Sequence, residues 1–356
     1  MECIYLKKSK PDLKFIKREH VIPAGIGGIE KLPRGYVSDE ANEFFSPLEL
    51  IALRKTILAV NRENVGPGKR GTLNVKKVKS PSIRVLKDTD KNGDNFKLGF
   101  VFAGETYMIP QLQMDFNDDE SSYKPTYFST TFEVENGKQI LYDFRQKLIR
   151  FLRNKGRSFK LVQMPFETDK HFINIGFYNG NWFAATSHKT INMDYLRLFF
   201  LKDIVSENLE SIYPEGKDKL FQKYQYQLEW NINEFYFLYA KTAFNSLALF
   251  RGSEFVLSDL FDPIRNAILH PEKCREFVID YLKPAESIID IIKKTPTKSH
   301  YVIITPVENN IAAYVGFYNE RTPAIIKLAE KYYGEFFIDA FVCDWVNKKE
   351  YRLSEF

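Results

Sequence analysis

The sequence predicts an α+β fold, and three observations lead to this prediction. Near the amino terminus, short β-like pieces alternate with turns. The middle of the chain shows helical periodicity over three stretches: 193–209, 218–250 and 262–282. Runs with β-like alternation return towards the carboxyl end: 301–307, 311–318 and 336–346. We therefore expect a small strand-and-helix module followed by a larger mixed α/β region.

The composition is that of a globular chain that can bury a core. Apolar residues make up 44% and charged residues 27% of the 356 residues, and the 15% of aromatic residues argue against disorder. No run of 18 or more apolar residues and no secretory signal is recognisable, so we expect a cytoplasmic protein without a membrane partner. Three widely spaced cysteines indicate no disulfide framework. No phosphate-binding loop, dinucleotide fingerprint or Ser-His-Asp order supports nucleotide hydrolysis or hydride transfer.

Charge is distributed unevenly along the chain. The net charge is +5, but residues 1–87 contain 18 Lys or Arg against 9 Asp or Glu, a local balance of +9. The remainder therefore carries −4. This asymmetry is compatible with a polyanion-binding module on a near-neutral body, and equally with an ordinary solvated surface.

Residues 13–60 predict the order strand, turn, strand, helix. A β-like piece at 13–16 leads into 19–23, and glycine-rich turns follow. Ser38 or Asp39 is a suitable helix N-cap, and apolar residues then recur with a period near 3.6. Pro47 could open a second helical series.

A polar loop at 88–94 is the predicted domain boundary, which gives a module over 1–87 and a second region over 88–356. The loop resembles the start of a calcium-binding loop, but Gly99 stands where a glutamate ligand is required, so we interpret it as a turn. Beyond it we expect strands at 97–103 and 127–134 and a helix at 141–154.

The residues that suggest chemistry are Glu19, His20 and Asn42. Adjacent residues on a strand point to opposite faces, so one side chain can hold a cation while the other addresses a water molecule. An amide oxygen from the following helix is a hard ligand of the kind that Mg²⁺ accepts. A partial set of protein ligands leaves room for a phosphate and water, as phosphodiester hydrolysis requires.

These residues carry a resemblance to a known family. The run 19–23 (Glu-His-Val-Ile-Pro), the Gly27-Gly28 turn and the pattern Val-x4-Asn-x2-Phe-Ser at 37–46 resemble HNH endonucleases of the ββα-metal type. The resemblance covers about the first 87 residues, and a weaker likeness extends to 240–245 and 261–265. It implies that Glu19 and Asn42 hold Mg²⁺ or Mn²⁺ and that His20 is the general base.

One departure from that family concerns zinc. Many members carry two C-x-x-C pairs that bind a structural zinc ion. The residues at those four offsets in this chain are Cys3, Leu6, Ser38 and Ala41. One cysteine cannot make a four-coordinate zinc site, so we expect no structural zinc and a fold supported instead by packing, with Tyr5, Leu6 and Tyr36 as candidates.

Several basic residues could contact DNA phosphates, although a solvated face is the alternative: Lys69, Arg70, Lys76, Lys77, Lys79 and Arg84. Glu49 could approach the metal or, as we favour, pair with Arg54 on the helix surface. The remaining histidines lack partners at helical spacing, and we expect structural roles for them: His171, His188, His270 and His300.

The resulting expectation is a metal-dependent endonuclease that hydrolyses DNA phosphodiester bonds. The alternative is a catalytically inactive module that binds DNA or a partner, and cleavage of RNA instead of DNA also stays open. Region 88–356 could recognise a partner protein or a small-molecule trigger. From resemblance alone, such an arrangement suggests an effector of prokaryotic antiviral defence.

Overall fold

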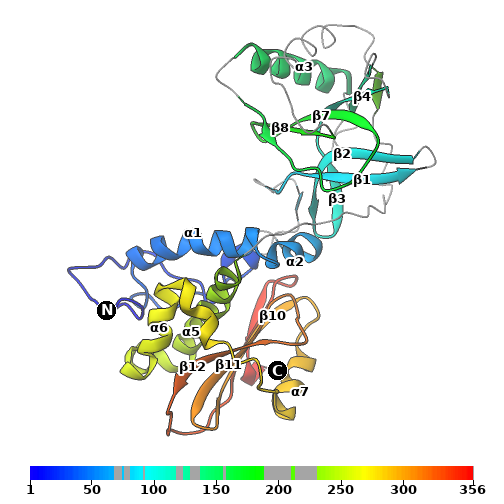
Figure 1. Cartoon of the computed structure of the whole chain (residues 1–356). Coiled ribbons are helices and arrows are strands. Elements are labelled where there is room, and N and C mark those ends of the chain that lie inside the picture. The colour runs from blue at the N-terminus through cyan, green and yellow to red at the C-terminus, as the bar shows by residue number, and fades with distance from the viewer. Residues whose placement is uncertain are drawn as a thin grey trace. The chain divides into compact units, whose positions relative to one another are not determined.

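The computed structural model describes residues 1–67, 74–75, 81–90, 93–117, 123–128, 137–154, 158–187, 210–212 and 231–355 (Figure 1). Helices and three β-sheets make up an α+β protein, as the sequence predicts. The chain forms two compact units: unit 1 comprises Met1–Lys77 and Leu228–Phe356, and unit 2 comprises Val78–Gln227.

These units differ from the predicted division into 1–87 and 88–356. The polar stretch expected to be a boundary pairs within unit 2, where Asp88 lies opposite Asn95 in an antiparallel hairpin. The carboxyl-terminal segment returns to the amino-terminal residues and shares one hydrophobic core with them. Local polarity marks a turn, but a shared core decides which segments form a unit.

The amino-terminal segment of unit 1 contains a short paired ribbon. Val21 N donates to Glu30 O (3.0 Å) and Leu32 N donates to Glu19 O (2.8 Å), on either side of the bridge between His20 and Lys31. The 3₁₀ helix η1 (Ala24–Ile26) joins the two arms. The short strand expected at 13–16 does not form, because these residues have no strand pairing, and Pro23 and η1 end the arm that begins at Glu19.

Helix α1 (Asp39–Lys55) follows, and Ser38 is its N-cap, because the Ser38 hydroxyl accepts from Ala41 N at 3.2 Å. Pro47 lies inside α1 and does not divide it into two helices. Helix α2 (Leu58–Val65) comes next and ends at Gly66, whose φ is 75°. The predicted helix after the ribbon is thus present, whereas the predicted strand at 13–16 is not.

The carboxyl-terminal segment of unit 1 begins with the long helix α5 (Ile232–Leu257), which is buried over most of its first four turns. Its helical successors are η4 (Asp259–Phe261), α6 (Asp262–Leu269), η5 (Pro271–Phe277) and α7 (Glu286–Lys294). The stretch predicted as one helix at 262–282 is therefore broken after Leu269, where Pro271 begins a 3₁₀ turn. The helix expected at 193–209 lies outside the described residues.

A five-stranded antiparallel sheet completes unit 1. Its strands are β10 (Ser299–Val307), β11 (Asn310–Gly316), β12 (Ala324–Glu330), β13 (Asp339–Asp344) and β14 (Lys349–Arg352), in the order β12-β11-β10-β13-β14. Helix α5 packs against β10, β11 and β12, and α1 packs against α5 (Figure 1). Helix α5 thus lies between α1 and the sheet and contributes side chains to the core that they share.

Unit 2 is built mainly from strands. The first three form an antiparallel sheet: β1 (Arg84–Asp90), β2 (Gly93–Phe102) and β3 (Glu105–Met108). The others form a six-stranded sheet in the order β6-β8-β7-β4-β5-β9: β4 (Gln111–Phe116), β5 (Tyr123–Phe128), β6 (Lys160–Leu161), β7 (His171–Tyr178), β8 (Asn181–Thr186) and β9 (Glu210–Ile212). Helix α3 (Gly137–Arg153) packs Phe144 and Leu148 against this sheet, in agreement with the predicted helix at 141–154.

Within the described residues, no helix combines the length and the apolar character needed to cross a membrane.

Candidate metal and phosphate site

The predicted site residues of unit 1 meet at one cavity. Glu19, His20 and Asn42 all line a cavity of about 520 Å³ that is formed by the ribbon, α1 and α2. Its other lining residues are Lys17, Arg18, Ala24, Gly25, Phe45, Ser46, Glu49, Leu50, Leu53, Arg54 and Arg62. Residues from separate elements thus line a single cavity.

Glu19 forms an ion pair with a lysine that lies 222 residues later in the sequence. Lys241 of α5 is 1% exposed and forms ion pairs with Glu19 Oε1 and with Glu49 Oε1, the latter at 2.8 Å; the side chains of Glu19 and Glu49 are 13% and 22% exposed. Burial alone would lower the pKa of Lys241, but the two carboxylates raise it above the ordinary lysine value. Lys241 is therefore charged at neutral pH and shared by both carboxylates.

The ion pair between Glu49 and Lys241 corrects the expectation that Glu49 pairs with Arg54. Glu49 lies on the side of α1 that packs against α5, where Lys241 reaches it. Burial raises the pKa of Glu49, and Lys241 opposes this rise. The charge of Glu49 is thus neutralised within the core side of the cavity rather than on the helix surface.

His20 is positioned through its backbone. Asn245 Nδ2, one helical turn after Lys241 on α5, donates to His20 O at 3.0 Å. Asn245 Oδ1 in turn accepts from the Tyr5 hydroxyl at 2.5 Å. Lys241 and Asn245 therefore fix two consecutive residues of the ribbon from the same face of α5.

Two further groups from the carboxyl-terminal segment hold the turn of the ribbon. Glu350 of β14 accepts from Ile29 N at 2.9 Å and from Glu30 N. His300 of β10 donates from Nε2 to Ile26 O (2.8 Å), because its Nδ1 accepts from Tyr318 N (2.9 Å). Burial lowers the pKa of His300 to about 4, so its ring is neutral at pH 7 and structural, as expected.

Asn42 differs from these partnered groups. Both amide atoms, Oδ1 and Nδ2, are shielded from water and have no hydrogen-bond partner within the described part of the chain. An unsatisfied buried polar group costs about 1–3 kcal/mol, which a cation or a water molecule on Oδ1 would offset. The Asn42 amide is therefore a candidate ligand for a cation or a water molecule.

The available donors fit Mg²⁺ or Mn²⁺. The Glu19 carboxylate and the Asn42 amide are hard oxygen ligands, and such cations usually keep several waters and take few protein ligands. Lys241 pairs with Oε1, one of the two carboxylate oxygens of Glu19. Where the structure describes the chain, no group of three or more His, Cys, Asp or Glu could hold a metal ion, so the cavity offers only this partial set.

The predicted zinc positions are occupied by ordinary packing and hydrogen bonds. Ser38 N donates to Cys3 Sγ at 3.5 Å, and the backbone of Cys3 pairs with Lys7 and Lys8 in a turn. Tyr5, next in this turn, is buried and packs edge-on against Phe45, with ring centroids 4.6 Å apart. Leu6 and Tyr36 are partly buried against the same core.

The sequence interpretation missed the arginines of the cavity as site residues. Arg54 of α1 and Arg62 of α2 both line it and make no hydrogen bond or ion pair with any described residue. Burial lowers the pKa of Arg54, and the charge of Arg62 lowers it further. Arg54 lies on the same helix as Asn42, but twelve residues are about 3.3 turns, so this spacing does not place the two side chains on one face and could not identify Arg54.

The predicted DNA-contacting residues cannot be assigned to this cavity. Five of them lie outside the described residues: Lys69, Arg70, Lys76, Lys77 and Lys79. Arg84 is the first residue of β1 and belongs to unit 2 rather than to the unit that carries Glu19.

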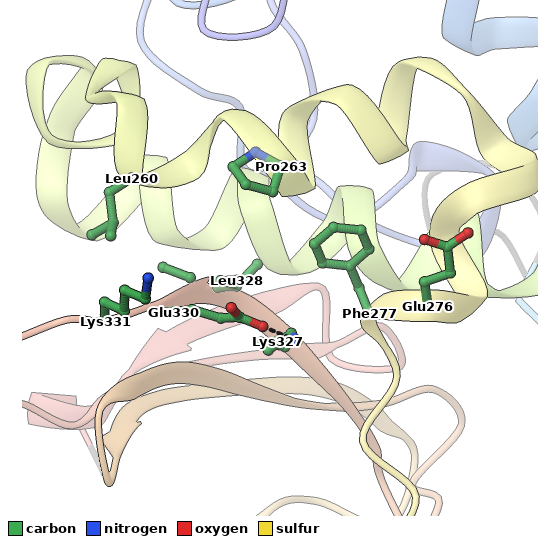
Figure 2. A pocket seen from close by; sticks show the side chains of 9 residues that line it. Leu260, Pro263, Glu276, Phe277, Lys327, Leu328, Glu330 and Lys331 are labelled. Atoms are coloured by element: carbon green, nitrogen blue, oxygen red, sulfur yellow. Dashed lines mark hydrogen bonds and ion pairs between the residues drawn. The ribbon is translucent and has the colours of Figure 1, made fainter.

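Unit 1 has a second cavity, of about 370 Å³, which lacks the combination of residue types found around Glu19, His20 and Asn42 (Figure 2). It lies between the α6–η5 segment and β12 and has an apolar lining that includes Leu260, Pro263 and Phe277. Of its four charged residues, Glu276, Lys327, Glu330 and Lys331, the pair Lys327 and Glu330 forms an ion pair. This second cavity contains no histidine or amide side chain, so we assign no chemistry to it.

Comparison with protein-family models, curated proteins and solved structures finds no match to this chain. What the cavity can do follows from its own side chains. It combines a carboxylate and an amide suited to a divalent cation, an imidazole suited to proton transfer, and guanidinium groups suited to an anion.

Proposed function

We propose that this protein is a metal-dependent endonuclease that hydrolyses phosphodiester bonds in DNA. The observation that carries the proposal is the convergence of Glu19, His20 and Asn42 on one cavity, although Asn42 follows His20 by 22 residues. The resemblance of the first 87 residues to HNH endonucleases supports the same assignment.

Each residue has a definite role in the proposed reaction. Glu19 and Asn42 would hold Mg²⁺ or Mn²⁺, and the chemistry that such a cation would supply is Lewis-acid stabilisation of charge on the phosphate. His20 takes a proton from the water that attacks phosphorus, because an imidazole is the side chain best suited to proton transfer near pH 7.

The residues around this set prepare it for that reaction. Lys241 pairs with both Glu19 and Glu49, so its single positive charge reduces the repulsion between the two carboxylates. Asn245 fixes the backbone of His20 and so limits the positions that the imidazole can reach. Preorganisation of this kind lowers the entropic cost of reaching the reactive geometry.

The test is nicking of supercoiled plasmid DNA by the purified full chain with Mg²⁺. We expect cleavage that EDTA abolishes and that His20→Ala reduces by about 10²–10⁴-fold, the usual contribution of a general base. His270→Ala is the matched control, because His270 is an exposed histidine outside the cavity. Equal nicking by wild type and His20→Ala would remove His20 from the mechanism, and RNA in the same assay tests the sugar preference.

A second function is favoured by the ion pairs of Lys241. Because Glu19 and Glu49 already share a cation of the protein, the cavity could serve binding of DNA or a partner without any metal. Such a binder keeps its DNA affinity in EDTA and cleaves nothing with Mg²⁺, Mn²⁺ or either nucleic acid. Metal-dependent cleavage would exclude this alternative.

A further inference from the structure

The side chains of two arginines of the cavity have no ion pair or hydrogen bond with a described residue. Arg54 lies in the last turn of α1 and Arg62 in α2, and neither has a carboxylate or carbonyl acceptor among the described residues. Other arginines of unit 1 do have one: Arg251 pairs with Asp339, Arg265 with Asp262, Arg275 with Asp280, and Arg18 donates to Leu32 O. The two arginines are therefore candidates for a ligand rather than for a structural contact.

Burial makes the missing partner of Arg62 significant. Its Nε is shielded from water and has no acceptor within the described part of the chain. Tyr318, whose hydroxyl is also buried without a described partner, lies close enough for Arg62 to act on its pKa, which burial raises and Arg62 opposes. A guanidinium that is partly desolvated and unpaired is unfavourable, and an anion bound to its accessible end would offset that cost.

The charge balance of the cavity also favours an anion. Four cationic side chains line it, Lys17, Arg18, Arg54 and Arg62, against the carboxylates of Glu19 and Glu49. Lys241, which pairs with both carboxylates, offsets one of their two charges, so the cations still outnumber the carboxylates. An excess of positive charge at a concave surface attracts anions and raises their local concentration.

The position along α1 separates Arg54 from Asn42, one of the proposed metal ligands. Asn42 and Arg54 are twelve residues apart on one helix, which at about 1.5 Å per residue is about 18 Å along its axis. The position of Asn42 along α1 is therefore distinct from that of Arg54, whereas Glu19 lies nearer to Arg54 because it shares Lys241 with Glu49. An anion with several phosphates in a row can occupy both positions.

We propose that Arg54 and Arg62 form a phosphate-binding subsite that holds the backbone of a nucleic-acid strand at a phosphate other than the one to be cleaved. The planar guanidinium fork matches two oxygens of a phosphate and makes bidentate, charge-assisted hydrogen bonds to it. The inference rests on the proposed function and specifies its substrate: a polynucleotide that lies along α1, rather than a mononucleotide or a simple phosphate ester.

The experiment measures binding in EDTA, so that it does not depend on cleavage. A short fluorescein-labelled DNA duplex is titrated with the full chain as wild type, Arg54→Met and Arg62→Met, at several salt concentrations. We expect each variant to bind about tenfold more weakly and to lower the slope of log K against log salt by about one, because one phosphate contact is lost. Methionine keeps most of the side-chain volume, and at Arg62 it removes a buried donor that has no acceptor, so the variants should fold.

Two controls make the result specific. Arg275→Gln removes an arginine that Asp280 already neutralises on the surface, and it should leave binding unchanged. His20→Ala should bind like wild type while losing cleavage, so failure of the nuclease proposal and failure of the subsite are separate outcomes. Wild-type affinity and salt slope in both methionine variants, with melting temperatures equal to wild type, would overturn the subsite.

Discussion

Lys241, which pairs with two carboxylates of the cavity, and the cavity arginines Arg54 and Arg62 differ in whether a described residue balances their charge. Lys241 is buried and shares its charge between Glu19 and Glu49, whereas the two arginines have no anion among the described residues. The same contrast separates two asparagines: Asn245 uses its amide within the protein, whereas the amide of Asn42 has no described partner. Lys241 and Asn245 therefore hold the ribbon in place, whereas Arg54, Arg62 and Asn42 are the candidates for contact with a ligand.

Among substitutions that test this contrast, we expect the largest loss of stability from a change at Lys241. Lys241→Met leaves two carboxylates in a buried position without a cation, so we expect the free energy of unfolding to fall by about 3–5 kcal/mol. Urea denaturation measures this change. Lys327→Met is the matched control: it breaks an exposed ion pair with Glu330 and should cost about 1 kcal/mol or less. Similar losses in the two variants would show that Lys241 is not a buried structural cation.

The second effect concerns pH and His300. The folded protein keeps His300 neutral with a pKa of about 4, whereas an unfolded histidine takes up a proton near pH 6.5, so protons favour the unfolded state. Its contribution to stability is complete above about pH 6.5 and is lost as the pH falls towards 4, by up to about 3 kcal/mol.

The difference between wild type and His300→Gln isolates this contribution, since nearby carboxylates titrate in both proteins. Unfolding free energies measured at pH 7 and at about pH 4.5 should differ less in His300→Gln than in wild type. An identical pH dependence in both proteins would show that His300 does not titrate as its burial requires.

A smaller effect distinguishes the two asparagines. Asn245→Ala removes an acceptor from the buried Tyr5 hydroxyl and a donor from the His20 carbonyl, and we expect a loss of about 2 kcal/mol in unfolding free energy. Asn42→Ala removes an amide without described partners, so the loss should stay below about 1 kcal/mol while Mg²⁺-dependent nicking falls. Equal destabilisation in thermal melts would mean that Asn42 has a structural partner.

The smallest expected effect is that of chelation. Cys3 already accepts a hydrogen bond from Ser38 N and is buried among apolar side chains, so the fold around it does not require a metal. We expect EDTA to leave the melting temperature nearly unchanged and elemental analysis to find no stoichiometric zinc. About one zinc per chain, with unfolding on chelation, would show that other ligands replace the missing cysteines.

The parts of the site that could be predicted are those set by local sequence. Glu19, His20 and Asn42 are joined by a turn and one helix, so their spacing restricts their geometry. The strands of the five-stranded sheet were likewise predictable, because apolar runs such as 301–307 mark buried strands. The nuclease activity read from these residues stays a prediction.

The parts that could not be predicted depend on distant contacts. Lys241 and Asn245 lie more than 200 residues from the ribbon, and spacing carries no information over such a separation. A lysine within an apolar helix was the available signal, since such a residue is rarely buried without a partner. The division after residue 87 failed to match the compact units for the same reason: a polar loop is a local feature, whereas the core shared by Val21, Phe45 and Phe237 is not.

The discontinuity of unit 1 has a consequence for how the protein is made. All of unit 2 lies between Lys77 and Leu228, so the ribosome synthesises it after the ribbon and α1 but before α5. At about 5–20 residues per second, Lys241 is added roughly 10–30 s after residue 77. During that interval Glu19 and Glu49 lack their cation, and Phe45 lacks Phe237 and the rest of its core. The cavity is therefore assembled late in synthesis, and until then the nascent amino-terminal segment presents apolar side chains of the kind that chaperones bind.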